Sequence, residues 1–484
     1  MDPILLIHGY SSDGKNNPVE AIYGNLPNDL RQQFGADVIK EIDLSRWISL
    51  SDGIALDDVS FAMERALREQ FSDLLTSGFH VIIHSTGALV VRNWIRLFSA
   101  KPSPIKNLIH LAGANFGSGL AHIGQGQLAR WGKFIFSGTG SGTRILRELE
   151  FGSWKTIDLH RTFLENGKDM YKDYRVQEFC LNGSQTLPGF ELIPIRYIKE
   201  DSSDSTVRTS ACNLNFNYIP VKAKETGKKI SKEAIRDFME KRLDNKKITE
   251  DHYEPNLSYL SKNREPVPFA ILFETAHFGD KIGIVNGVQN RAQVLPLIKQ
   301  ALQTRYDLNA YRETARVFAE ATNYTFREAT KLTSTILNWN KQEQYEGHAQ
   351  LIFRLRDQFG NPVENFDITI KSIESPGKPE KLEKLIEDKH NNDLDKGAIT
   401  FYLRTQEFQK SDQQWKEKLK DVASIDVEIT GHETLSDEIN YLPLTITLDS
   451  DQIQGIVQSF RTTIFDIELL RLPSEKVFAI TKTQ

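Results

Sequence analysis

Short apolar runs alternate with stretches of helical periodicity up to about residue 290, and this alternation constrains the fold more than any other feature. Between the runs, residues 57–75 and 89–98 carry apolar side chains at helical spacing. Strands that alternate with helices build a parallel sheet with helices on both faces, so the pattern predicts an α/β fold with a doubly wound, mostly parallel sheet. The predicted buried strands are 4–7, 38–42, 81–83, 108–111, 176–181, 192–198 and 269–273.

The character of the chain changes in its last third. Residues 291–340 continue in helical periods, whereas strand alternation begins near residue 347 and includes the turn at 357–362. A chain of 484 residues is also too long for one ordinary hydrophobic core. We therefore expect an α/β domain over 1–340 and a β-rich, sandwich-like domain over 346–484. The strands expected in the second domain are 349–355, 366–370, 398–403, 425–429 and 441–448.

The composition of the chain argues against several classes of function. The formal net charge of −5 gives no general attraction to nucleic acid, so we expect no nucleic-acid partner. Cys180 and Cys212 are the two cysteines, which excludes a disulfide scaffold and a cysteine metal cluster. The sequence predicts no metal and no other cofactor.

The N-terminal apolar run, residues 3–7, is too short for a secretory leader. No uncharged apolar stretch approaches the roughly 20 residues that a membrane span needs. We therefore expect no signal peptide, and a protein that is cytoplasmic, peripherally bound to a membrane, or exported by a signal-independent route. Peripheral membrane contact, a homo-oligomer, and the role of the second domain stay open.

Residues 79–92 form the central motif, an apolar strand, a turn of small residues around Ser85, and a helix. A nucleophile elbow has this order, because its strained turn projects the serine hydroxyl above the carboxyl ends of the strands. Gly87 provides one of the small neighbours that the elbow needs, while Ile83 replaces the first glycine of the usual G-x-S-x-G pattern. The alternative is a serine that caps an ordinary helix, and the strand–turn–helix context favours the elbow.

A His-Gly pair, His8 and Gly9, follows the first predicted strand. A backbone N–H from such a loop joins the N–H after the nucleophile to form the oxyanion hole of lipases. Tyr10 and Thr86 are then the predicted donors. His8 precedes the nucleophile, and we interpret it as structural rather than as a base.

The base and its orienting acid should follow the serine in the order Asp, His. Asp204 is the predicted acid in the polar loop after the strand at 192–198, and Asp201 is second; a polar loop without a catalytic role is the alternative. His277, in the loop after the last clear strand, is the predicted base. His252 competes, but its neighbourhood is charged and no strand precedes it, as expected for a surface insertion over about 222–262.

These motifs resemble bacterial lipases of the α/β-hydrolase superfamily, and most closely the PlaB-type phospholipases A of bacteria. The resemblance rests on residues 84–87, 203–208 and 277–279, and on a catalytic domain followed by a β-rich one. It implies an α/β-hydrolase fold and hydrolysis of phospholipid or lysophospholipid acyl esters through an acyl-serine. Ile83 and Ser205 stand where the family pattern has glycine.

The same resemblance suggests how the substrate is held. Residues 111–118 are similar to the loop that lines the acyl pocket of lipases, which makes Asn115 and Phe116 predicted pocket residues together with His84. We expect a cap over about 118–170, because an apolar stretch at 120–136 precedes a glycine-rich stretch at 138–142. Two other functions remain alternatives. One is a short-chain carboxylesterase or thioesterase, and the other is a hydrolase-fold binding protein without catalysis.

Overall fold

The computed structural model describes residues 1–8, 18–48, 51, 53–119, 143–185, 200–224, 245–258, 261, 264–332, 342–374, 382–436 and 438–473. The chain divides into two compact units. The first unit contains residues 1–215, 263–347 and 407–416, and the second contains residues 216–262, 348–406 and 417–484.

A six-stranded sheet forms the centre of the described part of the first unit, in the strand order β2-β1-β3-β4-β5-β8. Each neighbouring pair of strands in it is parallel. The strands are β1 (Ile4–His8), β2 (Ile39–Asp43), β3 (Phe79–His84), β4 (Ile105–Leu111), β5 (Gln177–Gly183) and β8 (Phe269–Leu272). The predicted parallel sheet is therefore confirmed, while the expected strand at 192–198 lies outside the described residues.

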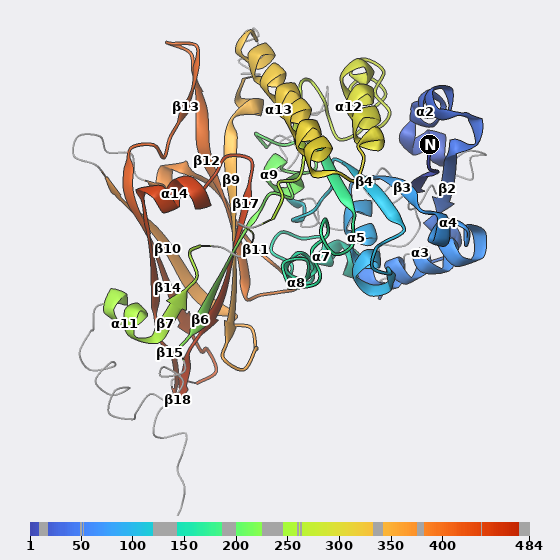
Figure 1. Ribbon diagram of the computed structural model, residues 1–484. Helices are drawn as coiled ribbons and strands as arrows, with labels where there is room; N and C mark the ends of the chain where they lie inside the picture. The colour runs from blue at the N-terminus through green and yellow to red at the C-terminus, as the bar shows by residue number, and fades with distance from the viewer. Residues whose placement is uncertain are drawn as a thin grey trace, which may run out of the picture. The chain divides into compact units, whose positions relative to one another are not determined.

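Helices cover both faces of this sheet (Figure 1). Within β1, Leu5 and Ile7 enter one core and Ile4 and Leu6 enter the other, as the two-residue period of a strand requires. The first core is closed by α3 (Leu56–Gln70), α5 (Gly87–Phe98), α7 (Thr143–Glu148) and α8 (Trp154–Thr162). The second is closed by α1 (Pro18–Tyr23), α2 (Leu26–Phe34), α12 (Arg291–Gln303) and α13 (Leu308–Thr330). This arrangement confirms the doubly wound α/β class.

The second unit consists mainly of β-structure, as expected. Its described residues form one sheet in the order β11-β12-β9-β17-β6-β7 and another in the order β10-β14-β15-β18, with β16 on β14. The short strand β13 (Gln414–Glu417) lies mostly within residues 407–416 of the first unit. Buried apolar side chains from both sheets share one core. The bounds are β6 (Asn217–Ala223), β7 (Tyr253–Pro255), β9 (Gly347–Asp357), β10 (Asn365–Glu374), β11 (Ile386–Asn391), β12 (Ala398–Gln409), β14 (Val422–His432), β15 (Ile439–Tyr441), β16 (Leu444–Asp449), β17 (Thr462–Leu469) and β18 (Arg471–Pro473).

The division differs from the predicted domain boundary at residues 216–262. The sequence pattern suggested that 222–262 was an insertion on the catalytic domain, yet β6, α11 (Asn245–His252) and β7 all belong to the second unit. The reason is sheet pairing, because β6 runs parallel to β17 and buries Ile219 and Val221 in the shared core. A strand this short, followed by a charged stretch, gives little signal of a partner more than 200 residues away.

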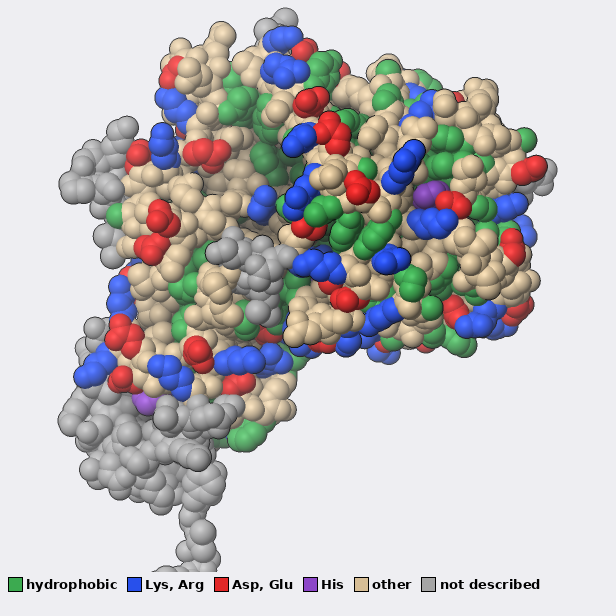
Figure 2. All heavy atoms as spheres, in the orientation of Figure 1, with side chains coloured by type: hydrophobic (Ala, Val, Ile, Leu, Met, Phe, Trp, Pro, Cys, Tyr) green, Lys and Arg blue, Asp and Glu red, His purple; other side chains and the backbone are tan. Residues whose placement is uncertain are grey.

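The described residues carry neither a membrane-spanning candidate nor a metal cluster. No helix among them is both long and apolar enough to cross a bilayer. No group of three or more His, Cys, Asp or Glu side chains in the same ranges could hold a metal ion. Figure 2 shows lysine and arginine side chains interspersed with acidic ones over the visible face.

Gly183, at the end of β5, provides a test of this packing. A Cβ there would lie 1.9 Å from the carbonyl oxygen of Thr275, two residues before His277. We expect Gly183→Ala to lower the free energy of unfolding by about 3 kcal/mol, the upper part of the usual range for overpacking, because the clash is with backbone that cannot rotate away. Urea denaturation measures the loss. Gly53→Ala is the matched control, since a Cβ at Gly53 meets nothing within 4 Å, and equal midpoints for the two variants would contradict the packing described.

Candidate active site

Ser85 lies on a sharp turn between β3 and α5, at the carboxyl end of its strand. Its backbone φ is 52°, in the left-handed region that L-residues rarely adopt. The turn is held by hydrogen bonds: the Ser85 amide donates to Leu111 O at 3.1 Å, and its carbonyl accepts from Ala88 N and Ala114 N, each at 3.2 Å. Strain of this kind persists only where the surroundings fix it, and it is typical of a nucleophile elbow.

The departure at Ile83 is explained by Gly87. A Cβ at position 87 would lie 3.3 Å from the Ile83 Cβ, which is tighter than nine in ten real Cβ contacts. The elbow therefore accepts a bulky residue at 83 because the residue at 87 has no side chain. Gly113 serves a similar purpose next to the elbow, since a Cβ there would lie 3.0 Å from the Cβ of Ala88.

A chain of hydrogen bonds runs from Ser85 through His277 to Asp204. The distance from Ser85 Oγ to His277 Nε2 is 3.0 Å, and that from His277 Nδ1 to Asp204 Oδ2 is 2.8 Å. Ser85 is 5% exposed, and the other two side chains are fully buried. A carboxylate only accepts, so Nδ1 carries the proton and Nε2 is the acceptor for the serine hydroxyl, an assignment that follows from the hydrogen-bond pattern. This is the arrangement in which an imidazole can take a proton from a serine.

The loop that carries Asp204 is fixed by its own backbone. Asp204 Oδ1 accepts from Thr206 N at 3.1 Å and from Val207 N at 2.8 Å, which leaves Oδ2 for the imidazole. Ser205 has a φ of 80°, the conformation that glycine adopts most easily. The departure from glycine at this position is therefore accommodated by a small residue, and the Ser205 amide donates to Ser203 Oγ at 3.2 Å.

An ion pair closes the base of the Asp204 loop. Arg208 Nε donates to Glu200 Oε2 at 2.9 Å, and Arg208 Nη2 donates to Glu200 Oε1 at 2.5 Å. The guanidinium also lies over the ring of Phe151, 4.2 Å from its centroid. Sequence reasoning missed this pair. The available signal was a pair of opposite charges placed symmetrically, four residues before and four after Asp204.

The predicted pocket residues Asn115 and Phe116 follow β4 and are buried. Asn115 Nδ2 donates to Cys212 O at 2.7 Å, and the ring of Phe116 lies 4.4 Å from that of His160. Burial lowers the pKa of His160 well below its usual value, so the ring is neutral and its Nε2 donates to Asn115 O. These contacts fix the loop beside the elbow, and its role in holding an acyl chain remains a prediction.

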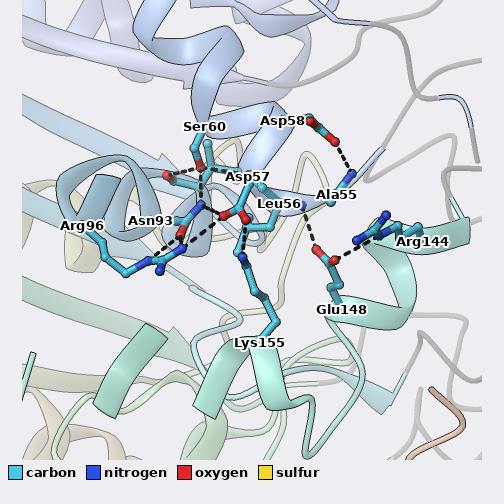
Figure 3. Close-up of polar contacts among 11 residues, drawn as sticks. Ala55, Leu56, Asp57, Asp58, Ser60, Asn93, Arg96, Arg144, Glu148 and Lys155 are labelled. Atoms are coloured by element: carbon cyan, nitrogen blue, oxygen red, sulfur yellow. Dashed lines mark hydrogen bonds and ion pairs between the residues drawn. The ribbon is translucent and has the colours of Figure 1, made fainter. Parts of the chain in front are cut away.

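Polar contacts tie α7 and α8 to the helices on the same face of the sheet (Figure 3). Glu148 Oε2 accepts from Leu56 N at 2.7 Å, so its carboxylate lies at the positive N-terminal end of α3. Lys155 and Arg96 both contact Asp57, at 2.5 Å and 3.1 Å. Phe151, whose ring lies against Arg208, falls between α7 and α8 in the sequence.

The alternative acid and base take other places. Asp201 Oδ1 accepts from Gln344 Nε2 at 3.0 Å, whereas Asp204 contacts the imidazole. His252 ends α11, which belongs to the second unit, and His277 is the histidine bonded to Ser85.

The remaining predicted site residues fall in three groups. Thr86 is the N-cap residue of α5, and its amide donates to no acceptor among the described residues. The His84 ring contacts that of His277, with centroids 4.5 Å apart. Tyr10 and residues 120–142 of the expected cap lie outside the described residues.

Comparisons with known proteins agree with this architecture. No protein-family model and no curated protein matches the chain. Among solved structures, phospholipase PlaB from Legionella pneumophila is 22% identical, with a TM-score of 0.77 over 100% of this chain and 97% of that chain. A second structure of that phospholipase, in complex with thio-NAD, gives 22% identity, a TM-score of 0.75 and the same coverage. The chain therefore shares the fold of PlaB along its whole length, and the expected resemblance is confirmed at the level of the fold.

The Glu200–Arg208 pair gives a testable prediction. We expect Arg208→Met to lower the free energy of unfolding by about 3–5 kcal/mol, because it leaves a buried carboxylate unpaired. Adding Glu200→Gln should recover part of that loss. Urea denaturation measures both, and Arg31→Met is the control, because its pair with Glu41 is about one-third exposed and contributes at most about 1 kcal/mol. Wild-type stability in Arg208→Met alone would contradict a stabilising role for the Glu200–Arg208 pair.

Proposed function

We propose that the chain is a serine hydrolase that cleaves acyl esters of phospholipids or lysophospholipids. The observation that carries the proposal is the buried hydrogen-bond chain from Ser85 through His277 to Asp204, with the serine on a left-handed turn. A serine hydroxyl is a weak nucleophile unless a base removes its proton, and His277 Nε2 has the position for that transfer.

In the first half of the proposed reaction, Ser85 Oγ attacks the ester carbonyl carbon while its proton moves to His277 Nε2. Asp204 stabilises the imidazolium that forms and keeps the ring oriented. His277 then returns the proton to the departing oxygen, so that the lysolipid or glycerol derivative leaves as an alcohol rather than as an alkoxide. The acyl group remains on Ser85 as an ester.

In the second half, a water molecule takes the place of the departed alcohol. His277 removes a proton from the water, whose oxygen attacks the acyl-serine carbonyl. Return of that proton to Ser85 Oγ releases the fatty acid and restores the enzyme. The atoms balance as one ester and one water giving one acid and one alcohol.

Negative charge develops on the carbonyl oxygen in both halves, and a positioned N–H can stabilise it. The Thr86 amide at the start of α5 is the donor we propose, because it follows the nucleophile and the positive end of a helix dipole favours an anion there. Tyr10 remains the second proposed donor.

The lipid part of the proposal rests on different support from the serine part. Hydrogen-bond geometry supports acyl transfer to water, whereas the substrate class is supported by the fold shared with phospholipase PlaB. Fold alone is an analogy for substrate class. A short-chain esterase or thioesterase would use the same three side chains.

Replacement of the three side chains tests the mechanism. We expect Ser85→Ala, His277→Ala and Asp204→Asn each to lower kcat on a nitrophenyl ester by about 10³-fold or more, because members of such a unit act together. His252→Ala and Asp201→Asn are the matched controls and should retain wild-type kcat. Full activity in His277→Ala would transfer the role of base to another residue.

Chain-length preference tests the substrate class. The wild type should release fatty acid from phosphatidylcholine or its lyso form and should favour long-chain over acetyl nitrophenyl esters. Mass spectrometry of the products measures the first and spectrophotometry the second. Turnover of acetyl esters without release from either phospholipid would leave a short-chain esterase instead.

A further inference from the structure

His84 immediately precedes the nucleophile, and the proposed mechanism gives it no task. It nevertheless contacts His277 in two ways. Its Nε2 lies 3.0 Å from the main-chain carbonyl oxygen of His277, and the two imidazole rings are 4.5 Å apart between centroids at an interplanar angle of 41°. One side chain from β3 therefore touches both the main chain and the ring of the proposed base.

We propose that His84 is a positioning residue, which holds His277 in the orientation that brings Nε2 to the Ser85 hydroxyl. This inference rests on the proposed function, because it assigns a role within that same site. It does not make His84 an acid, a base or a ligand of the substrate.

The direction of the hydrogen bond fixes the state of His84. A carbonyl oxygen only accepts, so His84 Nε2 carries a proton and donates. Burial, and next the neighbouring His277, lower the pKa of His84 well below its usual value, so the ring stays neutral around pH 7. A neutral neighbour suits a base that becomes an imidazolium during the reaction, since a second positive charge at this distance would oppose proton uptake.

The contacts from His84 complete the support of His277. The His277 amide donates to Asp204 O at 2.9 Å, and the ring donates to Asp204 Oδ2 at 2.8 Å, so both of these bonds come from the acid loop. His84 adds a bond and a ring contact from the strand that carries the nucleophile. The base is therefore held both by the loop of Asp204 and by the strand that leads to Ser85. Its position matters, because misplacement of a catalytic group by about 1 Å lowers the rate on the order of 10²-fold.

Three variants separate positioning from general stability. His84→Leu removes the donor and the ring, His84→Gln keeps an N–H donor, and His80→Leu makes the same change on the same strand at a buried histidine that contacts Asp2 rather than the site. We expect His84→Leu to lower kcat by about 10- to 100-fold with KM within about twofold, because a positioning residue acts on the reacting step, whereas loss of a pocket residue would raise KM. His84→Gln should recover most of that loss, and His80→Leu should retain kcat even where its thermal midpoint falls.

A second readout does not depend on turnover. The Nδ1 proton of His277 that bonds to Asp204 should give a far-downfield NMR signal, assigned by its loss in Asp204→Asn. We expect the signal to broaden or shift in His84→Leu and to persist in His84→Gln and His80→Leu.

The two readouts distinguish failure of this proposal from failure of the proposed function. A wild type without ester hydrolysis would refute the proposed function, and the NMR signal would still decide the role of His84. An unchanged signal together with wild-type kcat in His84→Leu would overturn the positioning role.

Discussion

The hydrogen bond between His277 Nδ1 and Asp204 Oδ2 is the interaction on which the site depends. It joins two loops of the first unit that are separated by more than 70 residues of sequence, and a second bond from the His277 amide to Asp204 O runs beside it. Both side chains are fully buried. Leaving either one unpaired would cost the free energy of its desolvation, which is larger than the net stabilisation that one hydrogen bond provides. The proton on Nδ1 then leaves Nε2 free to accept from Ser85.

Strained backbone surrounds this bond. Ser85, Ala112, Ser205 and Glu274 all have φ between 44° and 80°, although none of them is glycine. Each lies next to a strand end or in a loop of the site, where hydrogen bonds and packing fix the chain. Such positions cost of order 1–3 kcal/mol each and persist where the surroundings determine them. The free energy gained by packing the sheet against its two cores offsets the cost of this local strain.

The local features of the site, the elbow and the polar loop, were predictable from sequence because each is formed by a short run of consecutive residues. The elbow around Ser85 and the polar loop around Asp204 each follow an apolar run, and the structure brings both to His277. Two features were not predictable, because each depends on partners distant in sequence: the place of residues 216–262 in the second unit, and the contact between the Arg208 guanidinium and the Phe151 ring. The contact between His84 and His277 is another of this kind, since 193 positions separate the two residues.

The central claim is that the Ser85 hydroxyl is activated by His277. A fluorophosphonate probe tests it most directly, because the probe reacts with a serine only where an assembled base activates it. Peptide mass spectrometry after labelling should place one phosphonate adduct on Ser85 in the wild type, with labelling lost in His277→Ala. Wild-type protein that folds but carries no adduct on Ser85, or an equal adduct in His277→Ala, would contradict the account.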